Sequence, residues 1–316
     1  MELHRSLCDL ENVPGPVVIA IGVFDGLHLG HRAVIGTALE TAERQGGSAL
    51  VLTFDPHPVR ILKPDQAPRM LTSKEHKVEL LRRWGVPHVL VLPFSLQTAQ
   101  TPPENFVREL AERCRPLRAI CVGETWSFGR ERRGNLALLR MLGGELGFEA
   151  IGVAELFWEG NAVSSTRIRQ AVAAGDWAAA RMLLGRDYAV TGTVVEGRRI
   201  GRTLGFPTAN ISLDNQQLPP LGVYTVRVLR KGIGRPVRGV ANVGCRPTVA
   251  GGLGQTSLEV HLLDDSGDFY GEKWEVEFLE FLRPEKRFSG LDALRAQITC
   301  DVEAARDKLR SFSPAD

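Results

Sequence analysis

The first half of the chain alternates between short apolar runs and stretches whose apolar residues recur every three or four positions. Apolar runs typical of strands buried in a parallel sheet lie at residues 17–21, 49–54, 89–92, 119–122 and 148–153. Helical spacing lies between most of these runs, as at Val34, Ile35, Ala38 and Leu39. The alternation predicts an α/β domain with a parallel sheet and right-handed crossovers.

The pattern changes near residue 186, where helical spacing gives way to short strands separated by glycine turns. Alternating or apolar segments lie at residues 192–197, 222–228, 239–244, 258–264 and 274–282. Closely spaced strands of this kind predict an antiparallel β-barrel, and the apolar spacing from Leu291 to Val302 predicts a terminal amphipathic helix. We therefore predict two domains, 1–185 and 186–316.

Composition adds few constraints. The chain has 316 residues, which suggests about two domains, and a net charge of +2, which gives no reason to expect nucleic acid or a membrane as partner. Its five cysteines contain no C-x-x-C pair, and no apolar segment is long enough to span a bilayer. We expect a cytoplasmic protein and leave open whether it forms a homo-oligomer.

The first group of candidate functional residues lies between the strand at 17–21 and the helix that follows it. The residues from Ile19 read IAIGVFDGLHLGH, with His28 and His31 close to the predicted helix N-terminus. Such a terminus offers backbone N–H groups and a positive dipole to a phosphate, and the histidines could donate to phosphoryl oxygens. For a lone H-x-x-H, a turn with two surface histidines is the more common explanation.

Polar residues also follow other strands, at the edge where open α/β sheets bind ligands. Asp55 and His57 follow the second strand, although a simple turn would explain them as well. A loop with three arginines, residues 123–134, includes Thr125 and Trp126 and could reach phosphates or lie in solvent. A helix then starts with a possible second phosphate site, or a well-capped surface helix, at Ser164, Ser165, Thr166, Arg167 and Arg169.

In the second half, a basic glycine-rich loop from Gly197 to Phe206 is followed by Pro207, Thr208, Ala209 and Asn210. The loop is not a Walker A motif, but its glycines would let backbone N–H groups approach ATP phosphates. Thr208 and Asn210 occupy alternate positions of an extended segment, so their oxygens face the same way and could bind Mg²⁺. As isolated residues they would more often form a turn.

Several strings together resemble the bifunctional bacterial riboflavin kinase/FAD synthetase family. The first half contains G-x-F-D-G-x-H-x-G-H, F-D-P-H-P and S-S-T-x-I-R, and the second half contains G-R-x-L-G-F-P-T-A-N, G-V-A-N-V-G-x-R-P-T and E-V-H-L-L-D. The chain departs from the family's V-G-x-[DN]-F-x-F-G loop, because Thr125 replaces an acidic or amide residue and Trp126 replaces phenylalanine.

The resemblance implies a Rossmann-like nucleotidylyltransferase domain and a riboflavin kinase barrel, which convert riboflavin to FMN and then FMN to FAD and pyrophosphate, with ATP as co-substrate. In the first domain it implies catalysis by His28, His31 and Arg167, and binding by Gly22, Phe24, Asp25, Asp55, His57, Thr125, Trp126, Ser164, Ser165, Thr166 and Arg169. In the second it implies Mg²⁺ on Thr208 and Asn210, and binding by Gly197, Gly201, Arg202, Gly205, Phe206, Pro207, Asn242 and Arg246.

The resemblance also assigns Glu259 as the base of the kinase. Strand alternation puts Glu259 on the same face as His261 and opposite Val260, so a solvated surface position is compatible with the sequence too. Two other functions stay open at this point: a nucleotidylyltransferase acting on another phosphate with a degenerate barrel, and a flavin-binding sensor without catalysis.

Overall fold

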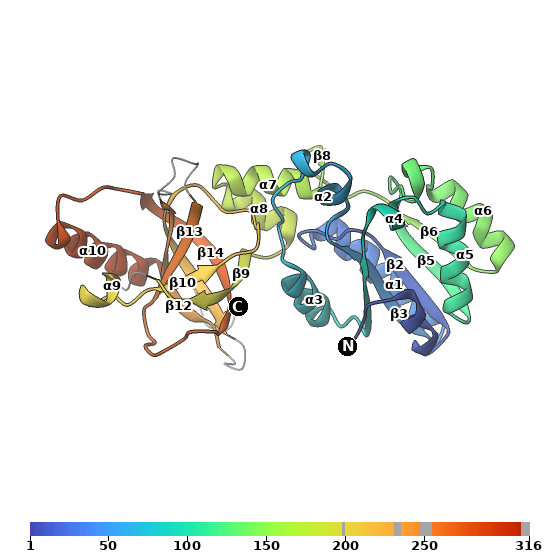
Figure 1. The fold of residues 1–316 in the computed structure, drawn as a ribbon, viewed down its shortest axis with the longest axis horizontal. Helices are drawn as coiled ribbons and strands as arrows, with labels where there is room; N and C mark the ends of the chain where they lie inside the picture. Colours follow the sequence, from blue (N-terminus) through green and yellow to red (C-terminus); the bar gives the residue numbers. More distant parts are fainter. Residues whose placement is uncertain (198–199, 231–234, 247–254, 311–316) are drawn as a thin grey trace. The chain divides into compact units, whose positions relative to one another are not determined.

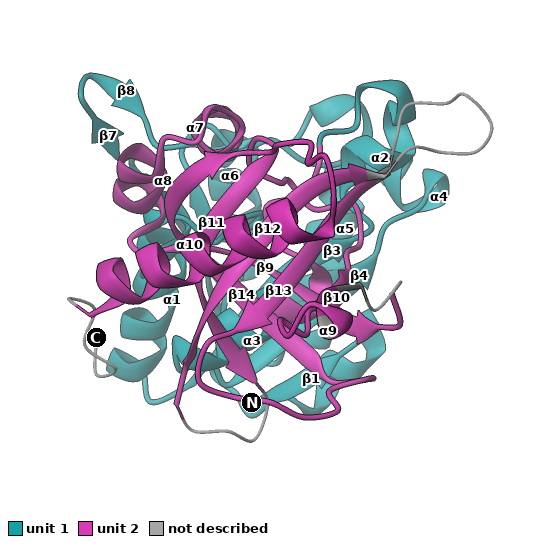
Figure 2. Ribbon diagram, turned by 90° about the vertical axis from the view of Figure 1, so that its left-hand side faces the viewer, with its two compact units in different colours: residues 1–68, 77–165 teal, residues 69–76, 166–316 magenta. Residues whose placement is uncertain are grey.

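The computed structural model describes residues 1–197, 200–230, 235–246 and 255–310, together with the backbone but not the side chains of Ile200, Arg202, Arg246 and Gln255. Arg198 and Arg199 of the predicted glycine-rich loop therefore lie outside the described residues, as do the side chains of Arg202 and Arg246. The chain divides into two compact units, residues 1–68 with 77–165 and residues 69–76 with 166–316 (Figure 2).

The first unit is built on a six-stranded sheet in the order β1-β4-β3-β2-β5-β6. Figure 1 labels β2, β3, β5 and β6 of this sheet. Every neighbouring pair is parallel, as predicted. The strands are β1 (Glu2–His4), β2 (Val17–Ile21), β3 (Ser48–Asp55), β4 (His88–Pro93), β5 (Leu117–Gly123) and β6 (Glu149–Val153).

Helices cover both faces of this sheet. On one face, Val18 and Ala20 of β2 pack with apolar residues of α1 (Leu29–Arg44) and α3 (Lys74–Arg83). On the other face, Ile19 and Ile21 pack with α5 (Pro103–Arg113) and α6 (Leu136–Leu146). Burial on both faces explains why the strands read as continuous apolar runs.

Some elements of this unit were not predicted. They are β1, α6, α2 (Pro58–Leu62), α4 (Leu96–Ala99), the hairpin of β7 (Phe157–Trp158) and β8 (Asn161–Ala162), and three 3₁₀ segments at Leu7–Asn12, Pro64–Gln66 and Arg130–Arg132. Apart from α6, each has six residues or fewer, which is too short for a repeating pattern to be recognised. Helix α6 fills the crossover between β5 and β6, and the Asn135 side chain caps it by accepting from the Leu138 N–H at 3.0 Å.

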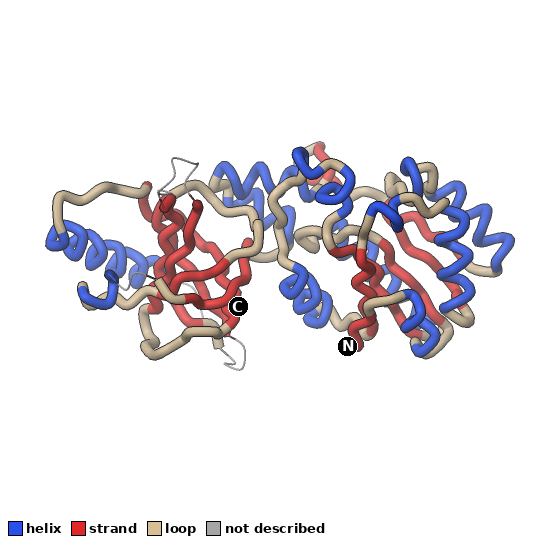
Figure 3. The backbone as a smooth tube through the Cα atoms, viewed as in Figure 1, coloured by secondary structure: helices blue, strands red, loops and turns tan. Residues whose placement is uncertain are grey.

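The second unit contains the predicted barrel, which closes in the order β10-β13-β12-β11-β14-β9 with antiparallel pairing throughout. Figure 3 shows its strands in red. They are β9 (Tyr188–Val195), β10 (Ala209–Ser212), β11 (Gly222–Arg230), β12 (Val237–Arg246), β13 (Gln255–Leu262) and β14 (Lys273–Pro284), with the short α9 (Ile200–Thr203) before β10. The terminal helix α10 (Leu291–Leu309) packs Ala305 and Leu309 against Val223 and Val240 of the barrel.

Two helices and one distant segment also pack with the barrel. The helices are α7 (Ser165–Ala174) and α8 (Trp177–Leu184), and Trp177 of α8 stacks on Phe278 with ring centroids 5.6 Å apart. The segment is residues 69–76, whose Ser73 hydroxyl lies 2.8 Å from the Thr191 hydroxyl. The predicted domain boundary at 185/186 stays a prediction, and the compact units differ from it in these segments.

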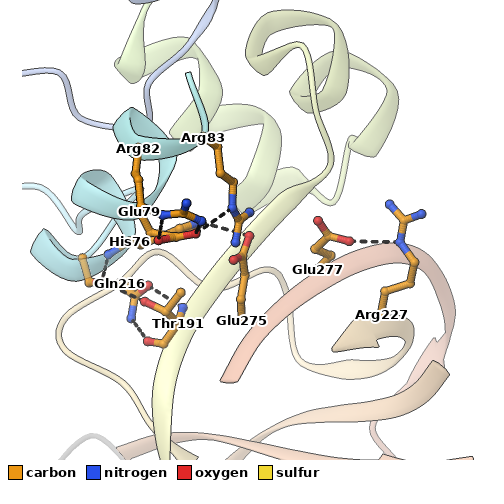
Figure 4. A network of polar contacts seen from close by, with 10 residues as sticks. His76, Glu79, Arg82, Arg83, Thr191, Gln216, Arg227, Glu275 and Glu277 are labelled. Carbon is orange, nitrogen blue, oxygen red and sulfur yellow. Dashed lines mark hydrogen bonds and ion pairs between the residues drawn. The ribbon is translucent and has the colours of Figure 1, made fainter. Parts of the chain in front are cut away.

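The attachment of residues 69–76 is polar and buried. His76 Nε2 lies 3.3 Å from Glu275 Oε1, and both side chains are almost fully buried (Figure 4). The Met70 N–H donates to the Asn215 carbonyl at 2.9 Å, and the Met70 carbonyl accepts from the Gln217 N–H at 2.7 Å. Because buried polar groups need partners, these contacts favour one arrangement of this segment on the barrel.

Among the helices in the described ranges, none combines the length and the apolar character that crossing a bilayer requires.

Candidate active sites

The turn after β2 is shaped by three residues with positive φ, namely Phe24 at 50°, Gly26 at 84° and Leu27 at 42°. Phe24 and Leu27 are buried, and the Phe24 ring folds back over Gly22, where a Cβ would lie 2.7 Å from Phe24 Cε1. Gly22 is therefore required by a close approach, and the turn is held by packing in a conformation that side chains rarely adopt.

The two predicted histidines lie together at the start of α1. His28 is the N-cap residue, and its Nδ1 accepts from the His31 N–H at 3.3 Å. The two rings stack with centroids 3.5 Å apart. Since Nδ1 accepts, the neutral ring of His28 carries its hydrogen on Nε2, which is the atom that can donate to a phosphoryl oxygen. A Cβ on Gly30 would lie 3.2 Å from the His28 ring, which explains the glycine between the histidines.

A second predicted segment meets this turn through its backbone. Ser165 Oγ donates to the Asp25 carbonyl at 2.9 Å, and the Asp25 side chain is buried. Ser165 is the first residue of α7, so Ser164 takes the N-cap position. The two serines therefore lie beside the H-x-G-H turn, where the N-terminus of α7 adds further backbone N–H groups.

The rest of the S-S-T-R-I-R string follows along α7. Thr166 is exposed, while Arg167 and Arg169 are half-buried. Arg169 Nε donates to the Arg69 carbonyl at 2.7 Å. That bond occupies part of the Arg169 guanidinium, and the role of Arg169 as an outer member of the site stays a prediction.

Lys77 of α3 is a residue that the sequence analysis missed. Its Nζ donates to the Val23 carbonyl at 2.7 Å and to Thr53 Oγ1 at 3.2 Å, directly beneath the H-x-G-H turn. Burial lowers the pKa of Lys77 to about 8, while the nearby Asp25 and Asp55 carboxylates act in the opposite direction. The signal was present in the sequence, because Lys77 occupies the apolar stripe that Leu80, Leu81 and Trp84 define.

Asp55 and His57 lie at the carboxyl end of β3, as predicted. Asp55 is the last residue of β3, and a cis peptide bond joins it to Pro56. His57 caps the short helix α2, its Nδ1 accepting from the Val59 N–H at 3.2 Å. The hydrogen of a neutral His57 ring is therefore also on Nε2.

The two unusual residues of the loop after β5 have defined partners. Thr125 Oγ1 donates to Glu155 Oε1 at 3.0 Å, which places a carboxylate beside the position where the family carries an acidic or amide residue. The Trp126 ring stacks on Phe128 with centroids 4.5 Å apart. One face of Trp126 is thus used by the fold, and the loop keeps an aromatic platform.

In the barrel, the register places the predicted kinase residues in one row. Asn210 of β10 pairs with Glu259 of β13, and Glu259 pairs with Asn242 of β12. Paired residues on neighbouring strands point to the same face, so one carboxylate lies between two amide side chains. Asn210 is buried and Glu259 and Asn242 are half-buried, while their neighbours Leu258 and Val260 fill the core.

Glycines in the loop before β10 permit close approaches to this row. A Cβ on Gly197 would lie 2.0 Å from Asn210 Nδ2, and one on Gly201 would lie 2.3 Å from the Phe206 carbonyl. Gly205 has φ 88°, which favours glycine. The backbone of Arg202 lies in α9, between these glycines.

The segment from Phe206 to Thr208 lies along the outer face of β13. His261 Nδ1 lies 2.8 Å from the Pro207 carbonyl, and the Phe206 ring meets the His261 ring edge-on. Pro207 and Thr208 also line a cavity of about 520 Å³, whose other walls include Leu262, Trp274 and the turn from Asp265 to Tyr270. This volume is in the range of small-molecule sites.

These features define a class of protein: an enzyme with one nucleotide-transfer site at the carboxyl edge of a parallel sheet and another on an antiparallel barrel. Models of two families match the chain, FAD synthetase over residues 10–167 and riboflavin kinase over residues 184–309. The chain therefore belongs to the bifunctional riboflavin kinase/FMN adenylyltransferase family, as its sequence relatives also show.

The chain is 41% identical over 318 residues to the bifunctional riboflavin kinase/FMN adenylyltransferase of Escherichia coli strain K12, with full coverage of both chains. It is 35% identical to the protein of that name in Bacillus subtilis strain 168, covering 94% of this chain and 92% of that one. A solved structure from Streptococcus pneumoniae, described as a macrolide-efflux protein, superposes with a TM-score of 0.80 at 30% identity, covering 94% of this chain and 97% of that chain.

Proposed function

We propose that this chain makes FAD from riboflavin in two ATP-dependent steps and that each step has its own site. The barrel phosphorylates riboflavin to FMN, and the parallel-sheet domain transfers AMP from ATP to FMN and releases pyrophosphate. The proposal is carried by the match of a family model to each half of the chain, and it is supported by the contact of Ser165 with the Asp25 carbonyl and by the pairing of Asn210 with Glu259. A flavin sensor would not need two sets of phosphate-binding groups.

In the adenylyl transfer, an oxygen of the FMN phosphate attacks the α-phosphorus of ATP in line, and the bond to pyrophosphate breaks. His28 Nε2–H donates to the phosphoryl oxygens as charge develops, and His31 lies stacked beside it. The N-cap bond fixes the orientation of His28 before the substrate binds. Ser164, Ser165, Thr166 and Arg167 then stabilise the leaving pyrophosphate from the start of α7.

Lys77 and the Thr125–Glu155 pair complete this site in the proposal. The Lys77 ammonium stabilises the Val23 carbonyl and the carboxylates of Asp25 and Asp55 beneath the turn. Glu155, held by Thr125, supplies the carboxylate that the family's loop sequence usually carries at position 125. The adenylyltransferase function therefore does not depend on an acidic residue at 125 itself.

In the kinase, Glu259 accepts the proton of the riboflavin hydroxyl as that oxygen attacks the γ-phosphorus of ATP, and the bond from the γ-phosphorus to ADP breaks. The amide side chains of Asn210 and Asn242 flank this carboxylate on the neighbouring strands. Backbone N–H groups of the glycine loop contact the phosphates, and the cavity beside Pro207 and Thr208 receives one of the substrates.

A divalent cation such as Mg²⁺ fits the kinase site. Thr208 offers a hydroxyl and Asn210 an amide oxygen, which are ligands that this hard cation prefers. Gly197 leaves the space in which the Asn210 side chain lies, because a Cβ there would overlap it. When bound, the cation neutralises charge on the ATP phosphates.

A cytoplasmic location, and small molecules rather than nucleic acid or membranes as partners, are further parts of the proposal. They are supported by the balanced charge and by five cysteines that are all unpaired.

The test is product analysis of purified protein incubated with riboflavin, ATP and Mg²⁺. We expect FMN first and FAD second, and FAD alone when FMN replaces riboflavin. A protein that adenylylates another phosphate but forms no FMN would match the rival function, a nucleotidylyltransferase with a degenerate barrel. Bound riboflavin without either product would match the sensor.

A further inference from the structure

Three potential metal ligands meet at the amino edge of the parallel sheet. Glu2 and His4 lie on one face of β1, since they are two residues apart in a strand, and Glu2 pairs with His88, the first residue of β4. One oxygen or nitrogen atom from each of the three side chains lies within 4.8 Å of the other two. No part of the proposed transfer chemistry uses these residues.

Two of the three ligand separations match those of a tetrahedral site. His4 Nε2 lies 3.3 Å from His88 Nδ1, and His88 Nδ1 lies 3.4 Å from Glu2 Oε2. Zn²⁺ binds imidazole nitrogen and carboxylate oxygen at about 2.0–2.2 Å, so neighbouring ligands of a tetrahedron are about 3.3–3.5 Å apart. Both measured separations equal that tetrahedral edge.

Hydrogen bonding alone does not account well for this cluster. His88 Nδ1 takes part in both contacts, and a ring nitrogen has either one hydrogen or one lone pair. It therefore cannot accept from His4 and donate to Glu2 at the same time. A metal ion accepts one lone pair from each of the three groups and so satisfies both contacts.

The two histidines are buried and the glutamate is exposed, an arrangement that lets an ion enter from solvent. His4 and His88 are only 7% and 8% exposed, which fixes the positions of the imidazoles, whereas the Glu2 side chain is 68% exposed. The carboxylate can therefore adjust its rotamer around an incoming ion, and water can take the fourth position.

We propose that Glu2, His4 and His88 form a Zn²⁺ site that ties the N-terminal strand to the sheet. Two imidazoles and one carboxylate suit Zn²⁺ and not Mg²⁺, which prefers oxygen ligands. His88 lies at the amino end of β4, whereas the His28 turn follows the carboxyl end of β2. Because the strands are parallel, the two sites lie at opposite ends of the strands. The role is structural, because β1 is a three-residue edge strand that pairs only with β4 among the described strands.

The experiment uses the untagged full chain, dialysed against Zn²⁺ in the presence of excess Mg²⁺, with bound metal measured by mass spectrometry. We expect one zinc per chain, and visible absorption typical of tetrahedral coordination when Co²⁺ replaces zinc. Free zinc at 100 times its dissociation constant should lower the unfolding equilibrium constant of the first domain about 100-fold.

Variants separate this site from the other histidines. Glu2→Gln should lose most zinc binding and keep its fold, because Glu2 is exposed, and His4→Ala should lose it as well. Leu3→Ala is the matched control, since Leu3 points to the opposite face of β1 and should bind zinc like the wild type. The proposal is overturned if the wild type binds no zinc, or if Glu2→Gln and His4→Ala bind it as tightly as the wild type.

Discussion

Lys77 gives the sharpest test of how the adenylyltransferase site is built. The residue is 5% exposed, and burial lowers the pKa of its side chain from an ordinary value of 10.5 to about 8. That shift corresponds to about 3.5 kcal/mol that disfavours the charged amine in the folded protein, at about 1.4 kcal/mol per pH unit. Lys77→Met keeps the length of the side chain and removes the charge, while Thr53 still donates to the Val23 carbonyl at 2.9 Å.

The sign of the pH effect follows from proton binding. Below pH 8 the amine is charged in both folded and unfolded chains, so the cost of burying the charged amine lowers the free energy of unfolding in full. Between pH 8 and 10.5 the unfolded chain binds more protons, and stability therefore rises with pH until the penalty is gone. Integrated from pH 7 to pH 9, the free energy of unfolding should rise by about 1.3 kcal/mol more in the wild type than in Lys77→Met.

Hydrogen exchange of peptides that cover β2 and β3 measures this difference without interference from the barrel. FAD formation should fall as pH rises through about 8, whereas FMN formation by the same protein should lack this step. Lys74→Met, an exposed lysine of the same helix, is the control and should match the wild type in both respects. An equal pH dependence of stability in wild type and Lys77→Met would refute the reasoning, as would a Lys77 pKa near 10.5 by ¹³C NMR.

Three further predictions follow from close contacts. Gly30→Ala should slow FAD formation about 10-fold while FMN formation persists, because a Cβ would lie 3.2 Å from the His28 ring and would shift it by a few tenths of an ångström; unchanged rates of FAD formation would contradict this. Gly197→Ala should impair FMN formation and weaken activation by Mg²⁺, because a Cβ would lie 2.0 Å from Asn210 Nδ2; a normal Mg²⁺ titration would count against it. A fragment from Arg186 to Asp316 should make FMN but unfold more easily than the barrel in the full chain, since it lacks the His76–Glu275 and Ser73–Thr191 contacts; equal stability would show that these contacts contribute little.

Much of the fold could be predicted because its patterns are local. Four of the five predicted strands of the first domain are buried over most of their length and read as apolar runs, whereas the fifth, β6, lies last in the sheet order and is mostly half-buried. The change from helical spacing to short alternating strands near residue 186 predicted the barrel. The strand β1 was not predicted, because three residues are too few to show an alternating pattern. Its place in the sheet depends on pairing with β4, about 85 residues away in the chain.

The site residues likewise divide into those that local sequence patterns predicted and those whose placement depends on contacts between distant segments. The placement of His28 and His31 at a helix N-terminus followed from the sequence, but the stacking of their rings and the tautomer of His28 needed coordinates. The row of Asn210, Glu259 and Asn242 depends on strand register, which no local pattern specifies. Lys77 reaches the site through a contact with Val23, 54 residues away in sequence.

The most direct test of the account is a crossed comparison of His28→Ala and Glu259→Gln, each supplied with ATP, Mg²⁺ and either riboflavin or FMN. His28→Ala should make FMN at the normal rate and FAD about 10²–10³ times more slowly. Glu259→Gln should make FMN about 10²–10⁴ times more slowly and adenylylate supplied FMN almost normally. A mixture of the two variants should restore FAD formation from riboflavin. Loss of both activities in either folded variant, or wild-type FMN formation by Glu259→Gln at saturating riboflavin and ATP, would contradict the assignment of one reaction to each half of the chain.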